Sequence, residues 1–295
     1  VEIAQKYTDH IIHYEWNDNF SAARNTGLDA AHGEWFLYLD ADEWFDDVTP
    51  LIDFFNSGEC DRYGAAAYIQ RNYNDFLGDS HSDAYVCRVF RRFPGIHFQN
   101  KIHEDVSYHP PLNILDAFVH HYGYIYRNEE ERRRKFERNG ELLESELKAN
   151  PDDLKAILQY TVQIIEDDPE KAVKYAKHGL EIVRNRNPEN HFHIQTRFAF
   201  HLAMGYFNCH RYTYVCTITD EALKRESEPS VFHLELYRLS QSAAWHQKNY
   251  EIAAKYGELY RKLYPIFQKG GMDRSLLVLE VFRAVTSEEA QKSLI

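Results

Sequence analysis

The sequence is poor in the residues and patterns that mark several protein classes. Among its 295 residues are only four cysteines, and none forms a CxxC pair or has the spacing of zinc ligands. A disulfide framework and a cysteine zinc site are therefore not expected, and we interpret the cysteines as reduced cytosolic thiols. No stretch of 18 apolar residues occurs, so the sequence predicts no membrane-spanning helix.

Positive charge is also scarce. Lys and Arg total 34 against 46 Asp and Glu, which gives a formal net charge of −12. This balance argues against nucleic acid or an anionic membrane as the main partner. No signal peptide is visible, and we expect a cytoplasmic protein, at most one that works at the inner face of the membrane. The length allows two domains with substantial cores.

The most informative stretch runs from Glu34 to Glu43, where a short apolar run ends in three acidic residues within four positions. It predicts a strand buried on both faces of a mostly parallel sheet, with Asp40 and Asp42 at the end where such sheets bind ligands. Crowded carboxylates repel one another unless a hard cation neutralises them. We therefore expect a diphosphate bound through Mg²⁺ or Mn²⁺. A solvated acidic turn is the alternative.

The segment before this run, residues 17–33, predicts a capped helix. Asp18 or Asn19 is the expected N-cap, and Gly33 is the expected terminator. Arg24 lies in the middle of this helix, where it could hold a phosphate or pair with a carboxylate. Considered alone, Arg24 fits an exposed salt bridge better.

The two segments together carry a composite motif that is far more specific than a lone Asp-x-Asp. It consists of Phe20-Ser21-Ala22-Ala23-Arg24-Asn25, then Gly33-Glu34-Trp35 and Leu37-Tyr38-Leu39-Asp40-Ala41-Asp42-Glu43. This resembles the "ARN…G-[DE]-W…LDADE" signature of family 2 glycosyltransferases of the GT-A fold, in the branch with an appended helical-repeat domain. The resemblance covers residues 1–127 as a catalytic domain and extends more loosely through the second half.

The resemblance implies a metal-dependent, inverting, hexosyltransferase-like enzyme that uses a nucleotide-sugar, with a UDP-sugar as the expected donor. Asp42 would be a direct ligand of Mn²⁺ or Mg²⁺, and Asp40 would contact the ribose, or the metal through water. Arg24 and Asn25 would lie in the donor pocket. Some members of the branch glycosylate peptides, including cysteine S-glycosyltransferases of bacteriocin pathways, and others act on surface glycans. The acceptor therefore stays open between a glycan, a lipid-linked sugar and a peptide.

Members of this family begin with a strand–helix–strand unit whose Asp-rich loop holds the nucleotide base and ribose. Residues 1–7 resemble the helix that follows that unit, so we expect the unit to be missing from this sequence. A chain without it should bind nucleotide poorly.

A second constellation contains His103, Glu104 and Asp105. An adjacent His and Glu can supply a general base, a metal ligand or a hydrogen bond to a sugar hydroxyl. The related glycosyltransferases carry "IHE" near the acceptor, which implies Glu104 as the base, Asp105 as the alternative carboxylate and His103 on the acceptor side. Without the upstream motif, a surface His–Glu pair would be favoured.

A third constellation, residues 119–124, resembles the family's "H-x-G-Y" segment. Enzymes of the GT-A fold often add a late histidine to the metal site, which implies His121, with His120 as the near alternative. Adjacent residues of a strand point to opposite faces, so at most one of them should reach a metal. A structural histidine is the competing interpretation.

Two further stretches, residues 64–73 and 84–93, are rich in Tyr, Val, Ile and Phe and predict strands. The second contains Arg88, Arg91 and Arg92, which could meet an anionic substrate. We favour the simpler interpretation that they are solvent-facing charges on an exposed strand.

From about residue 128 the composition becomes typical of helices. Residues 129–149 predict one long helix, and later helices recur about 40 residues apart in the manner of degenerate tetratricopeptide (TPR) repeats. Such repeats stack into a surface that binds peptides or partner subunits. A helical buttress for the catalytic domain, or a homodimer interface, is an equally ordinary role.

The predicted fold class is therefore α/β plus all-α. Residues 1–127 would form a partial GT-A, Rossmann-like domain, 128–149 a connecting helix and 150–295 a TPR-like repeat domain. The rival function is a catalytically inactive scaffold whose repeats bind a peptide or protein. A metal-dependent phosphohydrolase shares the acidic cluster but lacks a second His/Asp set of the usual kind.

Overall fold

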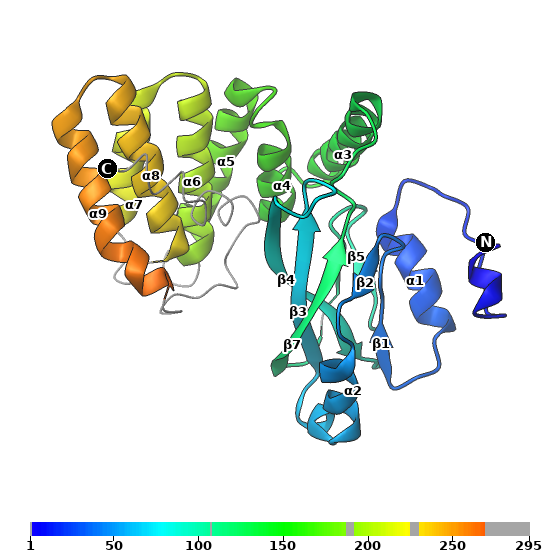
Figure 1. The fold of residues 1–295 in the computed structure, drawn as a ribbon. Coiled ribbons are helices and arrows are strands. Elements are labelled where there is room, and N and C mark those ends of the chain that lie inside the picture. The colour runs from blue at the N-terminus through cyan, green and yellow to red at the C-terminus, as the bar shows by residue number, and fades with distance from the viewer. Residues whose placement is uncertain (1, 107, 187–191, 225–229, 269–295) are drawn as a thin grey trace. The chain divides into compact units, whose positions relative to one another are not determined.

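The chain folds into two compact units, Val1–Glu129 and Glu130–Ile295. The structure is a computed structural model that describes residues 2–106, 108–186, 192–224 and 230–268 (Figure 1). The part of the predicted repeat domain beyond residue 268 lies outside the described residues. The predicted class, α/β followed by all-α, is confirmed.

The first unit contains a mixed sheet with short helices around it. Its elements are η1 (Ala4–Lys6), α1 (Phe20–Ala30), β1 (Trp35–Leu37), β2 (Glu43–Phe45), α2 (Thr49–Asn56), η2 (Glu59–Arg62), β3 (Ala65–Tyr73), β4 (His81–Arg91), β5 (Phe98–Gln99), β6 (Asp105–Val106) and β7 (Leu112–His121). Five strands form one sheet in the order β1-β4-β3-β7-β2, and β5 pairs with β6.

The expected mostly parallel sheet is wrong. Among the described strands, β3 and β7 are the one parallel pair, and the other neighbours are antiparallel. The strand before the acidic motif, β1, lies at the edge of this sheet, and Leu37 is 40 % exposed rather than buried on both faces. An apolar run does not reveal the direction of its partner, and β1 pairs with a segment more than 50 residues away, Trp35 opposite Arg91.

Helix α1 begins where the sequence predicts, because the side chain of Asn19 accepts a hydrogen bond from the Ala22 N–H (2.9 Å). Asn19, rather than Asp18, is therefore the N-cap. The predicted terminator is wrong, since α1 ends at Ala30 and the extended backbone of Ala31 (φ −74°, ψ 143°) turns the chain out of the helix before Gly33.

Two apolar clusters hold the first unit together. Phe54 of α2 packs with Tyr68 of β3 and Val119 of β7, and Leu28 of α1 packs with Phe90 and Phe98. Helix α1 is thereby fixed beside β5, and α2 covers the main sheet. These two contacts place the C-terminal ends of β1 and β7 and the loop after β5, which carry the predicted site residues.

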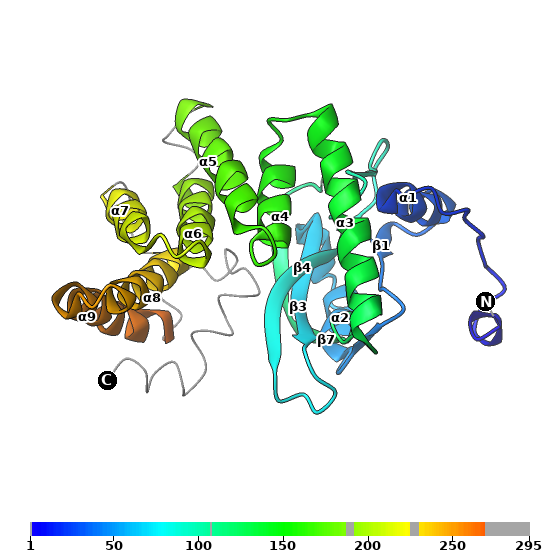
Figure 2. The same cartoon turned by 90° about the horizontal axis from the view of Figure 1, so that it is seen from above.

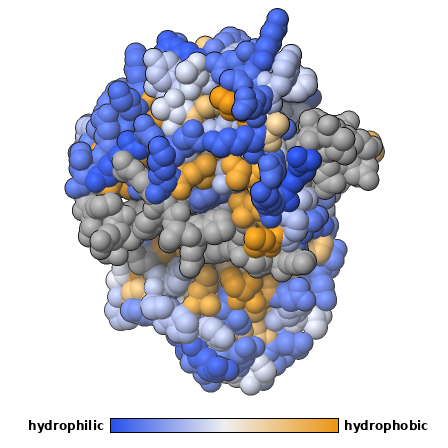
Figure 3. All heavy atoms as spheres, turned by 90° about the vertical axis from the view of Figure 1, so that its left-hand side faces the viewer, coloured by the Kyte–Doolittle hydropathy of each residue, from blue (hydrophilic) through white to orange (hydrophobic). Residues whose placement is uncertain are grey.

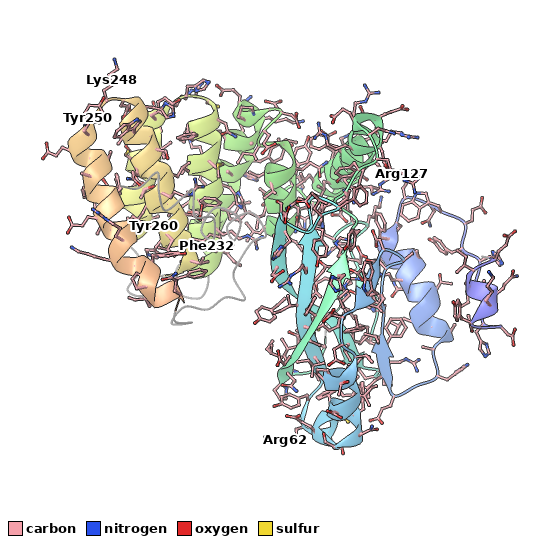
Figure 4. All side chains as sticks on the ribbon, in the orientation of Figure 1. Arg62, Arg127, Phe232, Lys248, Tyr250 and Tyr260 are labelled. Carbon is pink, nitrogen blue, oxygen red and sulfur yellow. The ribbon has the colours of Figure 1, made fainter. Side chains whose placement is uncertain are left out.

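The second unit consists of helices in its described residues. They are α3 (Glu129–Ala149), α4 (Leu154–Ile164), α5 (Pro169–Arg186), α6 (Phe192–Asn208), α7 (Tyr212–Leu223), α8 (Val231–His246) and α9 (Tyr250–Gln268). From α4 on, each helix packs against the next, as Figure 2 shows. Phe232 of α8 and Tyr260 of α9, labelled in Figure 4, belong to the core that joins α6 to α9.

One face of the molecule is mixed in character (Figure 3). On the face drawn in Figure 3, small groups of apolar residues lie among hydrophilic ones. Among the described residues, no helix has both the length and the apolar character needed to cross a bilayer.

Candidate functional site

The acidic motif forms a closed turn between β1 and β2. The Asp40 N–H donates to Oε2 of Glu43 (2.9 Å), and the Glu43 N–H donates to the Asp40 carbonyl (3.1 Å). The side chain of Glu43 is only 1 % exposed, and the Gln70 amide donates to its other oxygen. Glu43 therefore points into the protein and fixes the backbone of the motif.

Two arginines bracket Asp40. Arg24 Nη2 lies 2.9 Å from one carboxylate oxygen and Arg88 Nη1 3.0 Å from the other, while Arg88 Nη2 lies 2.9 Å from Glu43. Burial alone would raise the pKa of Asp40, but the two guanidinium groups outweigh it and hold that pKa below its usual value. The negative charge of Asp40 is thus balanced by protein groups.

The expected solvent-facing position of Arg88 is wrong, since its side chain is only 12 % exposed. Arg88 comes from the middle of β4, where its side chain reaches the turn between β1 and β2. Arg91 and Arg92 lie further along: Arg91 pairs with Glu34, and Arg92 donates to the Gly33 carbonyl (2.8 Å). Neither Arg91 nor Arg92 is part of the bracket around Asp40.

Arg24 also reaches the second constellation, because its Nε forms an ion pair with Glu104. Burial by itself would lower the pKa of Arg24, but Glu104 and Asp40 raise it. The ring of Tyr38 supports both arginines, whose guanidinium carbons lie 4.4 Å (Arg24) and 4.8 Å (Arg88) from its centroid. Burial, opposed by these two charges, raises the pKa of Tyr38 to about 12, so the phenol stays neutral.

Asn25 and Ser21 anchor the segment that leads to Glu104. The Asn25 side chain donates to the Phe98 carbonyl (3.0 Å) and accepts from the Phe98 N–H (2.7 Å), and the Ser21 hydroxyl donates to the Gln99 carbonyl (2.7 Å). The predicted donor-binding residue Asn25 therefore engages main chain of β5. Through these bonds α1 sets the position of the loop after β5.

The three residues of the second constellation have different surroundings. The Glu104 side chain is 11 % exposed and faces Arg24, whereas His103 and Asp105 are exposed. His103 adopts a left-handed backbone conformation (φ 51°), which is uncommon for a residue with a side chain. The charge of Asp105 adds to burial in raising the pKa of the Cys87 thiol to about 11.

Asp42 and His121 form a separate pair. His121 Nε2 lies 3.7 Å from Asp42 Oδ2, and the Nδ1 side of the ring is held by Asn72. Gly123 leaves the room for this pair, because a Cβ there would lie 2.4 Å from His121 Nε2 and 2.6 Å from Asp42 Oδ2. His120 points to the other face, where its two ring nitrogens contact Tyr73 and Asp46.

The predicted metal ligands fit a divalent cation only in part. A carboxylate and an imidazole nitrogen suit Mn²⁺, and Asp42 is 48 % exposed, so its oxygens are accessible. Asp40, the third predicted ligand, presents both oxygens to arginines instead. Within the described part of the chain, no group of three or more His, Cys, Asp or Glu side chains is arranged around a metal position. Two of the three predicted ligands thus converge.

Sequence reasoning missed the residues that support these groups. Arg88 and Glu43 fix Asp40, while Asn72 and Gly123 fix the Asp42–His121 pair. Glu43 is the last residue of the composite motif and Gly123 lies in the H-x-G-Y segment, so their positions were reason to consider both. Arg88 was interpreted as a solvent-facing charge, and Asn72, which lies within a strand, carried no signal.

Comparisons with known proteins show what this chain is similar to. Residues 1–111 match the model of a family described as Glycosyl transferase family 2. The SPbeta prophage-derived glycosyltransferase SunS of Bacillus subtilis is 28 % identical over 200 residues, which are 63 % of this chain and 45 % of that protein. A TPR repeat-containing protein of Synechococcus elongatus is 28 % identical over 216 residues, 68 % of this chain and 51 % of that protein. The chain thus spans about half the length of these curated relatives.

Among solved structures, the crystal structure of MamA matches 58 % of this chain and all of its own chain, at 12 % identity. The TM-score of 0.37 is too low to support an argument about the fold.

Proposed function

We propose that this chain, whose residues 1–111 form a family 2 glycosyltransferase domain, transfers a sugar from a nucleotide-sugar to an acceptor with the help of Mn²⁺ or Mg²⁺. The resemblance predicted from the motifs is confirmed, and the same matches support the proposed class of enzyme, a glycosyltransferase. The observation that carries the proposal is the convergence of Asp42 and His121 above Gly123. The UDP-sugar donor, the metal and the cytoplasmic location are parts of the proposal.

At the donor end, Asp42 and His121 would hold the cation. When bound, the metal would neutralise the charge that develops on the leaving diphosphate. Asp40 would contribute indirectly, by holding the shape of the turn that carries Asp42, since Arg24 and Arg88 occupy its two oxygens. Arg24 and Asn25 would shape the donor side through their bonds to Asp40 and to β5.

At the acceptor end, Glu104 would take the proton from the acceptor as its heteroatom bonds to the anomeric carbon. The bond from that carbon to the diphosphate breaks, its electron pair leaves with the diphosphate, and the configuration inverts. Arg24 fixes the Glu104 carboxylate in place. Asp105 is the alternative base, and the exposed His103 would face the acceptor.

The second candidate is a scaffold whose helical unit binds a peptide, a protein or a second copy of the chain. The observation in its favour is that Asp40, a predicted metal ligand, is neutralised by two arginines. In the helical unit each helix from α4 on packs against the next, and stacked helices of this kind form extended surfaces that can bind a partner.

Thermal unfolding with UDP and Mn²⁺ separates the two candidates. Ligand at 100 times its dissociation constant stabilises the folded state by about 2.7 kcal/mol, which raises the melting temperature. Because nucleotide binding by this sequence is expected to be weak, UDP is titrated to saturation. We then expect this rise in the wild type and in the control Asp116→Asn, an exposed carboxylate of β7, and a much smaller rise in Asp42→Asn. A wild type that UDP and Mn²⁺ do not stabilise, or an undiminished rise in Asp42→Asn, would favour the scaffold.

A further inference from the structure

An exposed tryptophan lies two residues after Asp42. Trp44 of β2 is 49 % exposed, although large aromatic side chains are usually buried. Its ring is stacked nearly parallel on His120 (centroids 5.0 Å apart, 23°) and on Tyr122 (5.0 Å, 11°). One side of the indole is therefore covered by these rings, and the exposed fraction leaves a flat aromatic face open to solvent.

The rings beneath Trp44 are held firmly. Tyr73, which is 8 % exposed, stacks on His120 at 11°, and its hydroxyl lies 2.8 Å from His120 Nδ1. The other ring nitrogen of His120 lies 3.2 Å from Asp46 Oδ1. Trp44 is thus the outer layer of a built stack, which we call the aromatic platform (Trp44, Tyr73, His120 and Tyr122).

The platform and the Asp42–His121 pair share the end of β7. Trp44 pairs with His120 in the sheet register, and the Tyr122 N–H donates to the Asp42 carbonyl (3.3 Å). His121 lies between His120 and Tyr122 and, because strand side chains alternate, points to the opposite face. A ligand ring on Trp44 therefore lies near the proposed reaction centre but on the other side of the strand end.

The chemistry of the platform fits a sugar ring. One face of a pyranose presents C–H bonds of slight positive charge, which match the negative face of an indole. Its hydroxyls need partners at the edge of the ring, and Asp46, whose side chain is 55 % exposed, offers carboxylate oxygens beside the stack. A peptide anchor would instead require a pocket that surrounds it, whereas Trp44 offers an open face.

We infer that Trp44 binds a pyranose ring of a carbohydrate acceptor, at a unit of the glycan other than the one that receives the sugar. This inference rests on the proposed function and selects a glycan among the acceptors left open by the sequence. Because β2 is an edge strand of the sheet, a glycan chain can pass around it from the platform to the Asp42 side.

Carbohydrate binding tests the inference without any need for turnover. A panel of tetrasaccharides built from glucose, galactose, mannose or N-acetylglucosamine is titrated into the protein, with tryptophan fluorescence and calorimetry as readouts. We expect at least one to bind the wild type, about tenfold weaker binding by Trp44→Ala, and an intermediate affinity for Trp44→Phe. The matched control is Trp245→Ala, because Trp245 is 63 % exposed and its ring meets Tyr250 edge-on.

The two proposals fail in different ways. Asp42→Asn should keep tetrasaccharide binding and lose the response to UDP with Mn²⁺, and Trp44→Ala should do the reverse. Circular dichroism of each variant checks that the fold is retained. Three results would overturn the inference: no binding of any tetrasaccharide at millimolar concentration, equal affinity in Trp44→Ala, or Trp44-dependent binding of peptides in place of sugars.

Discussion

Glu43 is the residue on which the acidic turn depends. It is almost fully buried, accepts hydrogen bonds from the Asp40 backbone and from Gln70, and pairs with Arg88. A buried carboxylate without its cation is strongly unfavourable, because the charge has lost its hydration. Arg88 therefore stabilises both the turn and the fold around it.

Replacing Arg88 should consequently cost more than replacing a surface arginine. We expect Arg88→Met to lower the free energy of unfolding by about 3 kcal/mol, since it leaves Glu43 buried and unpaired. The control Arg133→Met removes an arginine that is 68 % exposed and pairs with Glu137 on α3, and should cost less than about 1 kcal/mol. Urea unfolding measures both. Equal losses would mean that the Arg88–Glu43 pair does not support the fold.

His201 of α6 gives the protein a pH-dependent stability. The side chain is 1 % exposed, and burial, reinforced by the charge of Arg197, lowers its pKa to about 3. Below pH 6.5 the unfolded chain binds a proton at this position and the folded chain does not, so stability falls as the pH falls. Over pH 7 to 5 this effect amounts to about 2 kcal/mol.

A pair of histidine variants checks this effect. His201→Gln should lack this part of the decline in unfolding free energy between pH 7 and pH 5, and the exposed His210→Gln should keep it. Denaturant unfolding at the two pH values supplies the comparison. The same pH dependence in His201→Gln and in the wild type would show that His201 is not held neutral.

Two glycines within helices, Gly179 and Gly140, differ in how much space surrounds them. A Cβ on Gly179 of α5 would lie 2.3 Å from a ring carbon of Phe198, which is fully buried in α6. At Gly140 of α3 the nearest atom, Gln163 Nε2, would be 3.7 Å from such a Cβ. The two glycines therefore have opposite consequences for stability.

Alanine substitutions should separate them. Gly179→Ala is expected to destabilise the protein by about 2 kcal/mol through overpacking, and Gly140→Ala to stabilise it by up to about 1 kcal/mol through helix propensity. Chemical unfolding of the two variants is the measurement. A stabilising Gly179→Ala would mean that α5 and α6 are not packed as closely as described.

The sequence predicted individual helices and strands better than the pairing of the strands in the sheet. The helix of residues 129–149 and the N-cap of α1 could be predicted because caps and helical periodicity are local signals. The direction of the sheet was not, because β1 and β4 pair across more than 50 residues. The motifs did indicate residues that the fold gathers, Arg24 with Asp40 and Glu104, and Asp42 with His121. The buried position of Arg88 was not predicted, because its burial depends on the turn that it contacts.

At the scale of the whole molecule, the two units have separate cores. One is built from α1, α2 and the sheet, and the other from the helices after residue 129. Compact units with their own cores commonly unfold as separate steps. Calorimetry should resolve two transitions, of which Arg88→Met lowers one and Gly179→Ala the other. A single transition lowered by both variants would contradict this independence.

We propose that the Asp42–His121 pair serves glycosyl transfer. The release of UDP from a panel of UDP-sugars, with Mn²⁺ and the tetrasaccharide acceptors, tests this role directly. We expect release that chelation of the metal abolishes, that Asp42→Asn lowers about 100-fold and that Asp116→Asn leaves unchanged. Release that is undiminished in Asp42→Asn, or no release from any UDP-sugar, would contradict it.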